Sequence, residues 1–486
     1  MCAAGLEPAN IATNLRHGQV EAALAVEEIR QRVVGLDVKV PVLDGSRRPY
    51  VNFDNAATTP AFWDVCETLD LFLPWYSSIH RGTGFKSGVA TQAYDDARHI
   101  VGYFFGADPA EQVVIFVKNS TEAINKAARR IPLSPDDVVL VSLMEHHSND
   151  LPWRPQATVI HLAVTPQGEL DLEDVRRKFA EHGKRIKLLA ITGASNVTGA
   201  INPIHELAAL AHSYGARILV DAAQLAPHQA IHIGLAGDPG HIDFLVASAH
   251  KMYAPFGTGA LIGPREIFGR GAPDYSGGGT VEIVTEDDVY WTSPPDRDEA
   301  GSPNVLGAVA MAAACRVLRE IGMDRLAQHE ADLTRYTLKE LKAIEGIELY
   351  GNADPGCAGD RLGVIPFNVK GLSHYLVGAV LSTEYAIGVR NGCFCAHPYV
   401  LRLLDIPDPV AWSWRKQVIS GVRAHLPGLV RISYGCYNSH EEVDLLVRAL
   451  RKIACGEIAG DYEQDQATGT FWERTFHPDL DQYFKL

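Results

Sequence analysis

The stretch FLVASAHK, residues 244–251, places four apolar residues ahead of a polar end that contains a serine, a histidine and a lysine. A short apolar run of this kind predicts a buried strand whose carboxyl end reaches the edge of a sheet. Four more runs share the pattern and alternate with helical stretches between about residues 50 and 310: VVIFV (113–117), VVLVS (138–142), LLAIT (188–192) and ILVD (218–221). The alternation predicts an α/β fold with a mainly parallel sheet.

Polar residues follow each of these five runs. In open parallel sheets ligands bind beyond the carboxyl ends of the strands, so we expect these residues to meet in one crevice. In chain order they are Ser120 and Thr121; Glu145, His146 and His147; Asn196; Asp221 and Gln224; and Ser248, His250 and Lys251.

The remaining patterns predict how the chain is divided. Residues 1–50 are expected to form a helical segment that packs on the small domain, residues 51–310 the large domain, and residues 311–455 a smaller α+β domain. Residues 456–486 form a polar and aromatic tail without clear periodicity. A chain of 486 residues that is 47% hydrophobic is long and apolar enough for more than one core.

Charge and composition exclude several function classes. The formal charge of −15 argues against an extended electrostatic binding surface for nucleic acid or for an anionic membrane. The longest apolar run, about 305–315, is too short to span a bilayer, and the N-terminus lacks a secretory signal pattern, so we expect a cytoplasmic protein. The eight cysteines contain no CxxC pair, and we predict no metal site.

Lys251 and Asp221 carry the chemical argument. A lysine desolvated at the end of a buried strand becomes nucleophilic towards an aldehyde. A carboxylate at a neighbouring strand end can pair with a protonated pyridine nitrogen and strengthen the ring as an electron sink. Together the two side chains supply complementary halves of a site for pyridoxal 5'-phosphate (PLP). The alternatives are an ordinary surface lysine and an aspartate that caps a helix.

Other residues would complete such a site. Ser120 and Thr121 open a helical segment after a strand, where free amides and hydroxyls can hold a phosphate, although the same residues would also serve as a cap. The glycines before Thr280 allow close approach to an anion or form a plain turn. Either His146 or His147 could stack on a cofactor, and periodicity leaves the choice open. Arg431 follows a strand-like run and could grip a carboxylate.

These residues lie within motifs that resemble the cysteine desulfurase and selenocysteine lyase-like group of PLP enzymes. The matching motifs occur in order over roughly residues 50–455, and this ordered set is more specific than any single motif. They are FDNAATTP (53–60), IHRG (79–82), STEAIN (120–125), MEHHSND (144–150), SNVTGAINP (195–203), VDAAQLAPH (220–228), SAHKMYAPFGTG (248–259), GGGT (277–280), EAGSPN (299–304), IGVRNGCFCAHP (387–398) and RISYGCYN (431–438).

The resemblance implies PLP-dependent transferase fold type I, with a large domain built on a seven-stranded, mainly parallel sheet and a smaller α+β C-terminal domain. It implies a Schiff-base lysine at Lys251, a partner for the ring nitrogen at Asp221 and a stacking histidine at His146. The implied cofactor-binding residues are Ser120, Thr121, His146, Asn196, Asp221, Gln224, Ser248, His250, Lys251 and, from a second subunit of a homodimer, Thr280. The implied substrate-binding residues are Arg431, Asn196, His80 and Arg390.

Cys395 matches the family's nucleophilic cysteine. With Lys251 and His146 it completes the implied catalytic set, and its thiolate would take sulfur from L-cysteine or a related amino acid and release alanine. The alternative for Cys395, and more so for Cys393, is an ordinary packed thiol. The tripeptide Cys393-Phe394-Cys395 is closer to the sequence of molybdenum-cofactor sulfurases. Residues 399–430 lengthen the interval between Cys395 and Arg431. This segment could form a lid, a docking surface for a sulfur-acceptor protein or a plain loop.

Two other functions fit the same sequence. One keeps the fold and cofactor but performs amino transfer, racemisation or another C–S or C–Se cleavage, with Cys395 incidental. The other is a non-catalytic homologue that binds a sulfur-carrier partner. The presence of Lys251, Asp221 and Arg431 favours an enzyme.

Overall fold

The computed structural model describes residues 26–80 and 82–486. Its centre is a seven-stranded sheet in the order β4-β10-β9-β8-β7-β5-β6, in which β10 runs antiparallel to both neighbours and the other pairings are parallel. The strands are β4 (Gln112–Val117), β5 (Val138–Ser142), β6 (Thr158–Leu162), β7 (Ile186–Thr192), β8 (Arg217–Asp221), β9 (Phe244–Ser248) and β10 (Gly259–Pro264). The expected fold, an α/β chain with a mainly parallel seven-stranded sheet, is confirmed.

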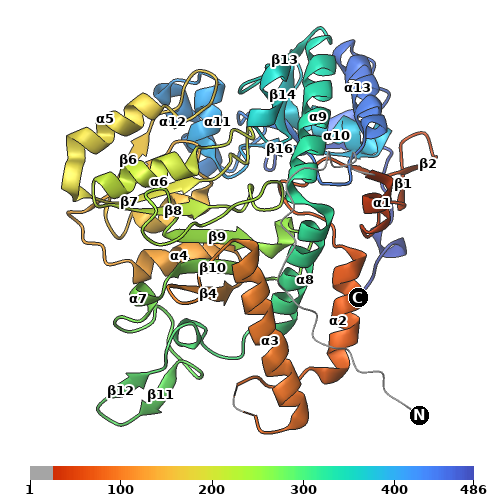
Figure 1. The fold of residues 1–486 in the computed structure, drawn as a ribbon. Helices are drawn as coiled ribbons and strands as arrows, with labels where there is room; N and C mark the ends of the chain where they lie inside the picture. The colour runs from red at the N-terminus through yellow and green to blue at the C-terminus, as the bar shows by residue number, and fades with distance from the viewer. Residues whose placement is uncertain (1–25, 81) are drawn as a thin grey trace, which may run out of the picture.

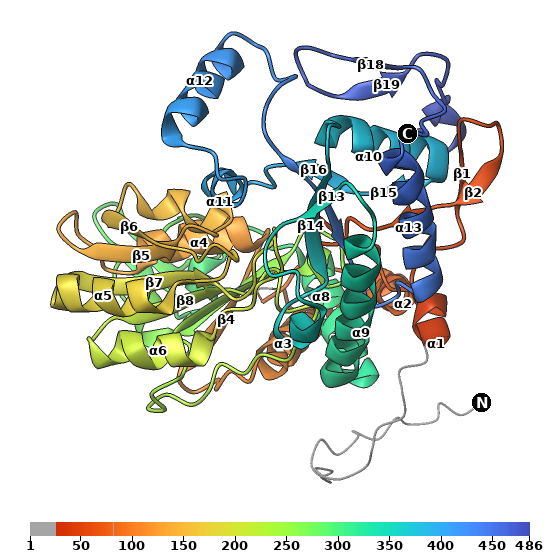
Figure 2. The ribbon, with the colours of Figure 1, turned by 90° about the horizontal axis from the view of Figure 1, so that it is seen from above.

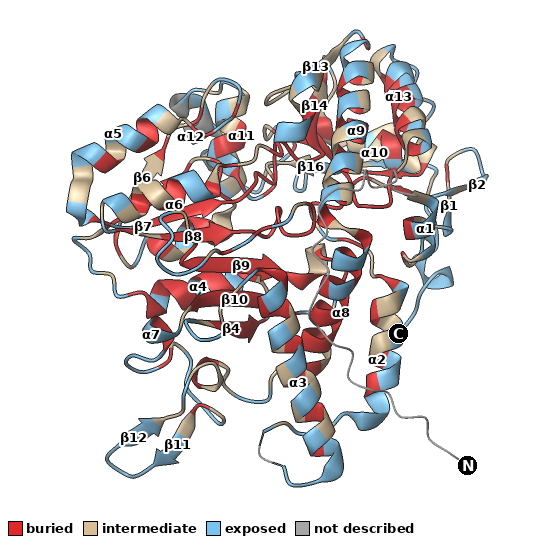
Figure 3. Cartoon of the chain, in the orientation of Figure 1, coloured by how far each residue is buried: buried red, intermediate tan, exposed pale blue. Residues whose placement is uncertain are grey.

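Both faces of this sheet are covered, which explains why its strands are apolar without alternation. Side chains that point to opposite faces enter different cores: Val113 and Ile115 pack on one side, and Val114 and Phe116 on the other. The helices of this part are α2 (Trp63–Phe72), α3 (Phe85–Phe104), α4 (Ser120–Arg130), α5 (Leu172–His182), α6 (Ile204–Ser213), α7 (Arg265–Phe268) and α8 (Val305–Ile321). Figure 3 shows the strands as the most deeply buried layer.

A second core surrounds a four-stranded antiparallel sheet in the order β13-β14-β17-β16. Figure 1 shows this sheet and its helices above the large sheet. The strands are β13 (Ile347–Leu349), β14 (Val364–Val369), β16 (Arg390–Gly392) and β17 (Leu429–Ser433), and the helices are α9 (Met323–Lys342), α10 (His374–Tyr385) and α13 (His440–Ala454). Gly322, with a φ of 96°, divides the predicted long helical stretch into α8 and α9.

The two cores share segments near the expected boundaries. Val51 and Phe53 pack in the second core, where β3 (Val51–Asn52) pairs with β15 (Ile387–Gly388), whereas α8 packs in the first core. The division at residues 50 and 310 therefore stays a prediction.

Of the N-terminal segment, the structure describes residues 26–50, and these are only partly helical. Its described part holds a short helix, α1 (Val26–Gln31), followed by the hairpin β1 (Lys39–Pro41) and β2 (Arg47–Pro49). Arg30 donates hydrogen bonds to the Tyr437 carbonyl and to Glu442 on α13. The first half of the segment expected to be helical, residues 1–25, lies outside the described residues.

The segments without a predicted structure contain short elements. Residues 399–430 include most of α11 (His397–Leu403) and all of α12 (Asp408–Ile419), and the tail forms a hairpin of β18 (Tyr462–Gln464) and β19 (Phe471–Glu473). A further hairpin, β11 (Val281–Val284) and β12 (Val289–Trp291), projects from the large sheet (Figure 1). Figure 2 shows α12 and the β18–β19 hairpin on the same side of the molecule, and Arg423 donates its backbone N–H to the Gln466 carbonyl at 2.9 Å.

Across residues 26–80 and 82–486, no helix combines the length and the apolar character needed to cross a membrane.

Candidate active site

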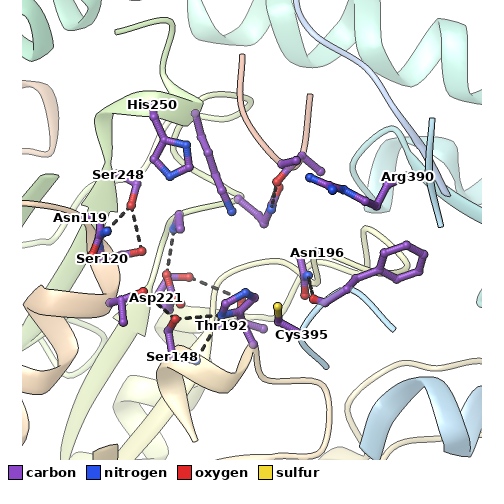
Figure 4. Close-up of a pocket in the computed structure, with 18 of the residues that line it drawn as sticks. Asn119, Ser120, Ser148, Thr192, Asn196, Asp221, Ser248, His250, Arg390 and Cys395 are labelled. Atoms are coloured by element: carbon purple, nitrogen blue, oxygen red, sulfur yellow. Dashed lines mark hydrogen bonds between the residues drawn. The ribbon is translucent and has the colours of Figure 1, made fainter. Parts of the chain in front are cut away.

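A cavity of about 470 Å³ lies at the carboxyl ends of the parallel strands, where the small sheet meets the large one. Its walls contain residues that follow five strands of the large sheet, together with residues of β16, β17 and the loop after β16. The predicted residues that line it are Ser120, Thr121, His146, Asn196, Asp221, Gln224, Ser248, His250, Lys251, Arg390, Cys395 and Arg431. Figure 4 shows this arrangement.

One end of the cavity is a cup of hydroxyls and amides at the start of α4. Ser120 donates its backbone N–H to Ser248 Oγ at 2.8 Å, and Ser248 Oγ donates to Ser120 Oγ at 2.9 Å. Thr121 Oγ1 lies 2.7 Å from Ser148 Oγ, and Asn119 caps the helix by accepting from Glu122 N at 3.0 Å. A helix N-terminus with several hydroxyls is suited to a phosphate dianion.

Lys251 and Asp221 lie in the middle of the cavity. Burial lowers the pKa of Lys251 to about 8, although the Asp221 carboxylate opposes this shift. Burial raises the pKa of Asp221, while Ala223 N donates to Asp221 Oδ1 at 3.0 Å and Lys251 favours the charged form. A reactive amine and a buried acid therefore face the same space.

Two histidines of the cavity are neutral at pH 7. Burial, with the nearby Lys251 charge, lowers the pKa of His146 to about 4 and that of His250 to about 4. Ser148 donates its backbone N–H to His146 Nδ1 at 3.1 Å, so the ring proton of His146 is on Nε2. His147 does not line the cavity; its ring stacks on that of His397 with centroids 4.9 Å apart, so of the two histidines it is His146 that faces this space.

The opposite wall carries two arginines around one carboxylate. Arg431 is buried and donates to Asp54 Oδ1 at 3.0 Å and to the Asn196 carbonyl at 2.8 Å, while Arg390 Nε lies 3.2 Å from Asp54 Oδ2. Arg431 Nε is buried without a hydrogen-bond partner. The Arg431 guanidinium lies 4.8 Å from the ring centre of Phe394. The two guanidinium groups are suited to bind the carboxylate of a ligand as well as that of Asp54.

Cys395 is exposed and lies on a loop that hydrogen bonds from Asn196 and His147 hold in place. Phe394 and Cys395 have φ values of 52° and 55°, a left-handed conformation that costs free energy for residues with side chains. Asn196 Nδ2 donates to the Phe394 carbonyl at 2.8 Å, and His147 N donates to the Cys395 carbonyl at 2.8 Å. In Figure 4 the Cys395 sulfur lies on the far side of Asp221 from Ser248.

Cys393 differs from Cys395 in its surroundings. Its thiol donates to the Pro427 carbonyl at 3.3 Å, and burial raises the pKa of Cys393 to about 11. A protonated, hydrogen-bonded thiol is a poor nucleophile, which fits the packing alternative.

Two predicted residues lie away from this cavity. His80 lines a separate pocket together with Gly278 and Gly279. The Thr280 side chain is buried and donates to the Gly277 carbonyl at 2.8 Å.

Sequence reasoning gave no role to Asp54, and it placed Glu145 among the crevice residues without assigning it a role. Asp54 lies inside a quoted motif, but only the fold brings it between two arginines. Glu145 is buried behind the cavity, where it accepts from Ser142 Oγ, Asn149 Nδ2 and Thr192 N at 2.5, 2.7 and 3.0 Å. Burial raises the pKa of Glu145 to about 8. The run of polar residues after β5 was the available signal for Glu145.

The donor set fits PLP. An amine suits the aldehyde, a buried acid suits the ring nitrogen, and a cup of hydroxyls at a helix N-terminus suits the phosphate. Fold and site thus define a PLP-dependent enzyme.

The chain belongs to the aminotransferase class-V family, whose model matches residues 51–446. A probable cysteine desulfurase of Halalkalibacterium halodurans is 34% identical over 85% of this chain and 95% of that protein. A cysteine desulfurase of Dickeya dadantii is 34% identical over 85% of this chain and 94% of its own length.

Solved structures agree with these relatives. The cysteine desulfurase of Thermococcus onnurineus, in its apo form, has a TM-score of 0.77 at 31% identity and covers 90% of this chain and 100% of its own. The cysteine desulfurase CsdA of Escherichia coli, with an S-sulfonic acid, has a TM-score of 0.73 at 26% identity, over 90% and 100% of the two chains. Cysteine desulfurase-like class-V enzymes are therefore the group to which this chain is similar over most of its length.

Proposed function

We propose that this enzyme removes sulfur from L-cysteine, carries it as a persulfide on Cys395 and releases alanine. The observation that supports this most is an exposed thiol on a loop held by Asn196 and His147, lining the same cavity as Lys251 and Arg431. The names of the similar enzymes point to the same reaction.

The residues divide into those that would hold the cofactor and those that would hold the substrate. Lys251 would bind the PLP aldehyde, Asp221 its ring nitrogen, and His146 would stack on the ring. Ser120, Thr121, Ser248 and His250 would hold the phosphate, with Gln224 and Asn196 beside the ring oxygen. Arg431, with Arg390, would bind the substrate carboxylate, because their guanidinium groups already share the carboxylate of Asp54. PLP, when bound, supplies an electron sink for the electrons left at the substrate Cα.

Proton transfer falls to groups whose pKa values suit it. Lys251, with a pKa of about 8, can take the substrate Cα proton on its Nζ and return it at neutral pH. His146 stays neutral, with its Nε2–H available as a donor to a ligand in the cavity. These two side chains thus move protons without a permanent charge on His146.

Sulfur transfer is balanced without any added oxidant. The Cys395 thiolate attacks the substrate sulfur, an Sγ–S bond forms, and the substrate Cβ–S bond breaks. The electron pair of the broken bond stays with the carbon skeleton, which takes up protons and leaves as alanine. L-cysteine and the enzyme thiol become alanine and the enzyme persulfide.

A Cys395→Ser variant tests the proposal against the other reactions of this fold. Alanine and sulfide formation from L-cysteine should fall by about a thousandfold or more, because the nucleophile is absent, while the colour of the bound cofactor is retained. Cys393→Ser is the matched control and should keep most activity. Full alanine formation by Cys395→Ser would instead identify a lyase or transferase in which this thiol is incidental.

We also propose a cytoplasmic homodimer in which the loop that carries Thr280 enters the site of the partner chain, where the Thr280 side chain would exchange its contact with the Gly277 carbonyl for one in that site. His80 and the Gly278–Gly279 turn line a pocket apart from the Lys251 cavity, which supports completion by another copy. Mixing Lys251→Ala with Thr280→Val chains tests this, because one site of the mixed dimer would receive an intact Lys251 and an intact Thr280. Recovery of activity above either parent is expected. No recovery, or a monomer in sedimentation, would refute the shared site.

A sulfur-acceptor protein is the partner we propose for the persulfide. The exposed position of Cys395 and the projecting segment 399–430 support an acceptor that docks beside the loop. A candidate acceptor thiol should increase turnover of L-cysteine, and deletion of residues 405–421 should remove that increase while basal turnover remains.

A further inference from the structure

A cluster of two histidines and one aspartate lies at the amino-terminal edge of the large sheet. His212 is on the last turn of α6, Asp243 directly precedes β9, and His241 is in the loop before it. Parallel strands β8 and β9 run from this edge towards Asp221 and Ser248. The cluster is therefore at the opposite edge from the catalytic cavity, and nothing in the proposed reaction uses it.

The hydrogen bonds of the two rings fix their tautomers. His212 Nδ1 lies 2.7 Å from the Pro239 carbonyl, and His241 Nδ1 lies 2.7 Å from the Asp238 carbonyl. A carbonyl oxygen can only accept, so both Nδ1 atoms carry the proton. In the neutral rings each Nε2 then presents a lone pair. A carbonyl on the second nitrogen is the arrangement that orients histidines as metal ligands.

Both lone pairs point to the same carboxylate. His212 Nε2 lies 2.8 Å from Asp243 Oδ2, and His241 Nε2 lies 3.6 Å from Asp243 Oδ1. The rings are stacked with centroids 4.2 Å apart and planes at 22°. Facing lone pairs and a carboxylate repel one another unless a cation is shared. One proton on His212 would compensate a single contact, whereas a divalent ion would compensate all three groups.

We propose that His212, His241 and Asp243 bind a divalent transition-metal ion of the Zn²⁺ type, with a fourth position open to water. Two imidazoles and a carboxylate are a typical zinc donor set. One ligand atom from each of the three residues lies within 4.8 Å of the other two. Tetrahedral ligands of Zn²⁺ are about 3.4 Å apart, so ligand atoms that now lie within 4.8 Å of one another would have to move closer, and the stacked rings would have to turn, to bind one ion.

The surroundings hold this donor set in place. Ile218 donates its backbone N–H to Asp243 Oδ2 at 2.9 Å, which orients the carboxylate. Arg217 Nε is 3.9 Å from Asp243 Oδ1, and its guanidinium is paired at 2.7 Å with Glu266, a carboxylate that Arg270 also contacts. The side chains of His212 and His241 are 19% and 22% exposed, which gives an ion access from solvent.

The proposed ion would fasten the loop before β9 to the end of α6. Its effect would be on the stability of this edge of the sheet, because the catalytic cavity is at the other edge. No sequence pattern predicts this site, because the spacing of residues 212, 241 and 243 matches no short metal motif.

Zinc binding to the holoenzyme tests the proposal. After treatment with a chelator, bound Zn²⁺ is measured by equilibrium dialysis and elemental analysis in the wild type, His241→Ala, Asp243→Asn and His205→Ala. His205 is the matched control: it is on α6 too, and its Nδ1 lies 2.9 Å from the carbonyl of Gly240 in the same loop, but it is outside the cluster. Cofactor absorbance confirms that each variant is folded.

Wild type and His205→Ala should each bind one equivalent of Zn²⁺, with an affinity at least about tenfold higher than that of His241→Ala or Asp243→Asn. With Co²⁺ in place of Zn²⁺, wild type and His205→Ala should show the visible absorption of a tetrahedral site, and the two cluster variants should lack it. The proposal is overturned if the wild type binds no Zn²⁺, because the cluster is then a proton-bridged ion pair. It is also overturned if the cluster variants bind as the wild type does, or if His205→Ala loses binding equally.

Discussion

The reactivity of Lys251 can be tested through its pH dependence in the cofactor-free enzyme. The amine must be neutral to attack an aldehyde, and burial lowers the pKa of Lys251 to about 8. At pH 8 about half of the Lys251 amines are therefore neutral, compared with about 0.4% for an ordinary lysine with a pKa of about 10.4. The structure thus predicts about a hundredfold more reactive amine than an exposed lysine has.

The perturbation is Asp221→Asn, which removes the carboxylate that raises the pKa of Lys251. The initial rate of PLP incorporation is followed by absorbance between pH 6 and 10, with N-acetyl-lysine in the same buffers to correct for titration of PLP itself. The wild-type rate should rise with pH to a midpoint near 8, and the Asp221→Asn midpoint should be lower. Lys251→Ala should acquire no Schiff-base absorbance. A wild-type midpoint near 10, or an upward shift in Asp221→Asn, would refute the account of this amine.

Three further predictions follow from the geometry. Arg431→Ala should raise KM for L-cysteine by about 10- to 100-fold, because a pair of charged hydrogen bonds to the substrate carboxylate is lost. Arg390→Ala should raise KM less, because Arg390 is exposed. Equal effects of the two variants in steady-state kinetics would argue against these roles. Glu145 has its pKa raised to about 8, so its contribution to stability is complete at low pH and is lost as pH rises through 8; urea unfolding from pH 5 to 9 should show a flatter dependence for Glu145→Gln, and an unchanged slope would contradict this. Gly259→Ala should destabilise the fold by about 1–3 kcal/mol, because its Cβ would lie 2.6 Å from the Ala247 carbonyl and 2.8 Å from Asn119 Cα, whereas Gly278→Ala, with open space around it, should leave the unfolding midpoint unchanged.

The large sheet could be predicted because its strands are buried on both faces, so each is a short apolar run that ends in polar residues. The strands FLVAS and VVLVS have the expected bounds, 244–248 and 138–142. β10 was missed: its sequence, GALIGP, is bounded by glycine and proline, which usually mark turns, and it becomes a strand because it fits between β4 and β9. β6 was missed because this edge strand is only partly buried: Thr158 is exposed and the three residues after it are half-buried.

The cavity residues that follow large-sheet strands could also be predicted, since parallel strands bring their carboxyl ends together. The contribution of Asp54 could not, because Asp54 and Arg431 are far apart in sequence and meet only when the small sheet packs on the large one. The left-handed backbone at Phe394 and Cys395 has no sequence signal either, since neither residue is a glycine. His80 and Thr280 do not line the cavity of their own chain, and their role follows from the homodimer proposed above.

The most direct test of the proposed reaction is tandem mass spectrometry of the peptide that contains Cys395, after brief incubation of the enzyme with L-cysteine and alkylation of its thiols. The account predicts the mass of one additional sulfur atom on Cys395, in wild type and in Cys393→Ser, in step with the alanine released in the first turnover. Alanine released without sulfur on Cys395, or sulfur found on Cys393 instead, would contradict it.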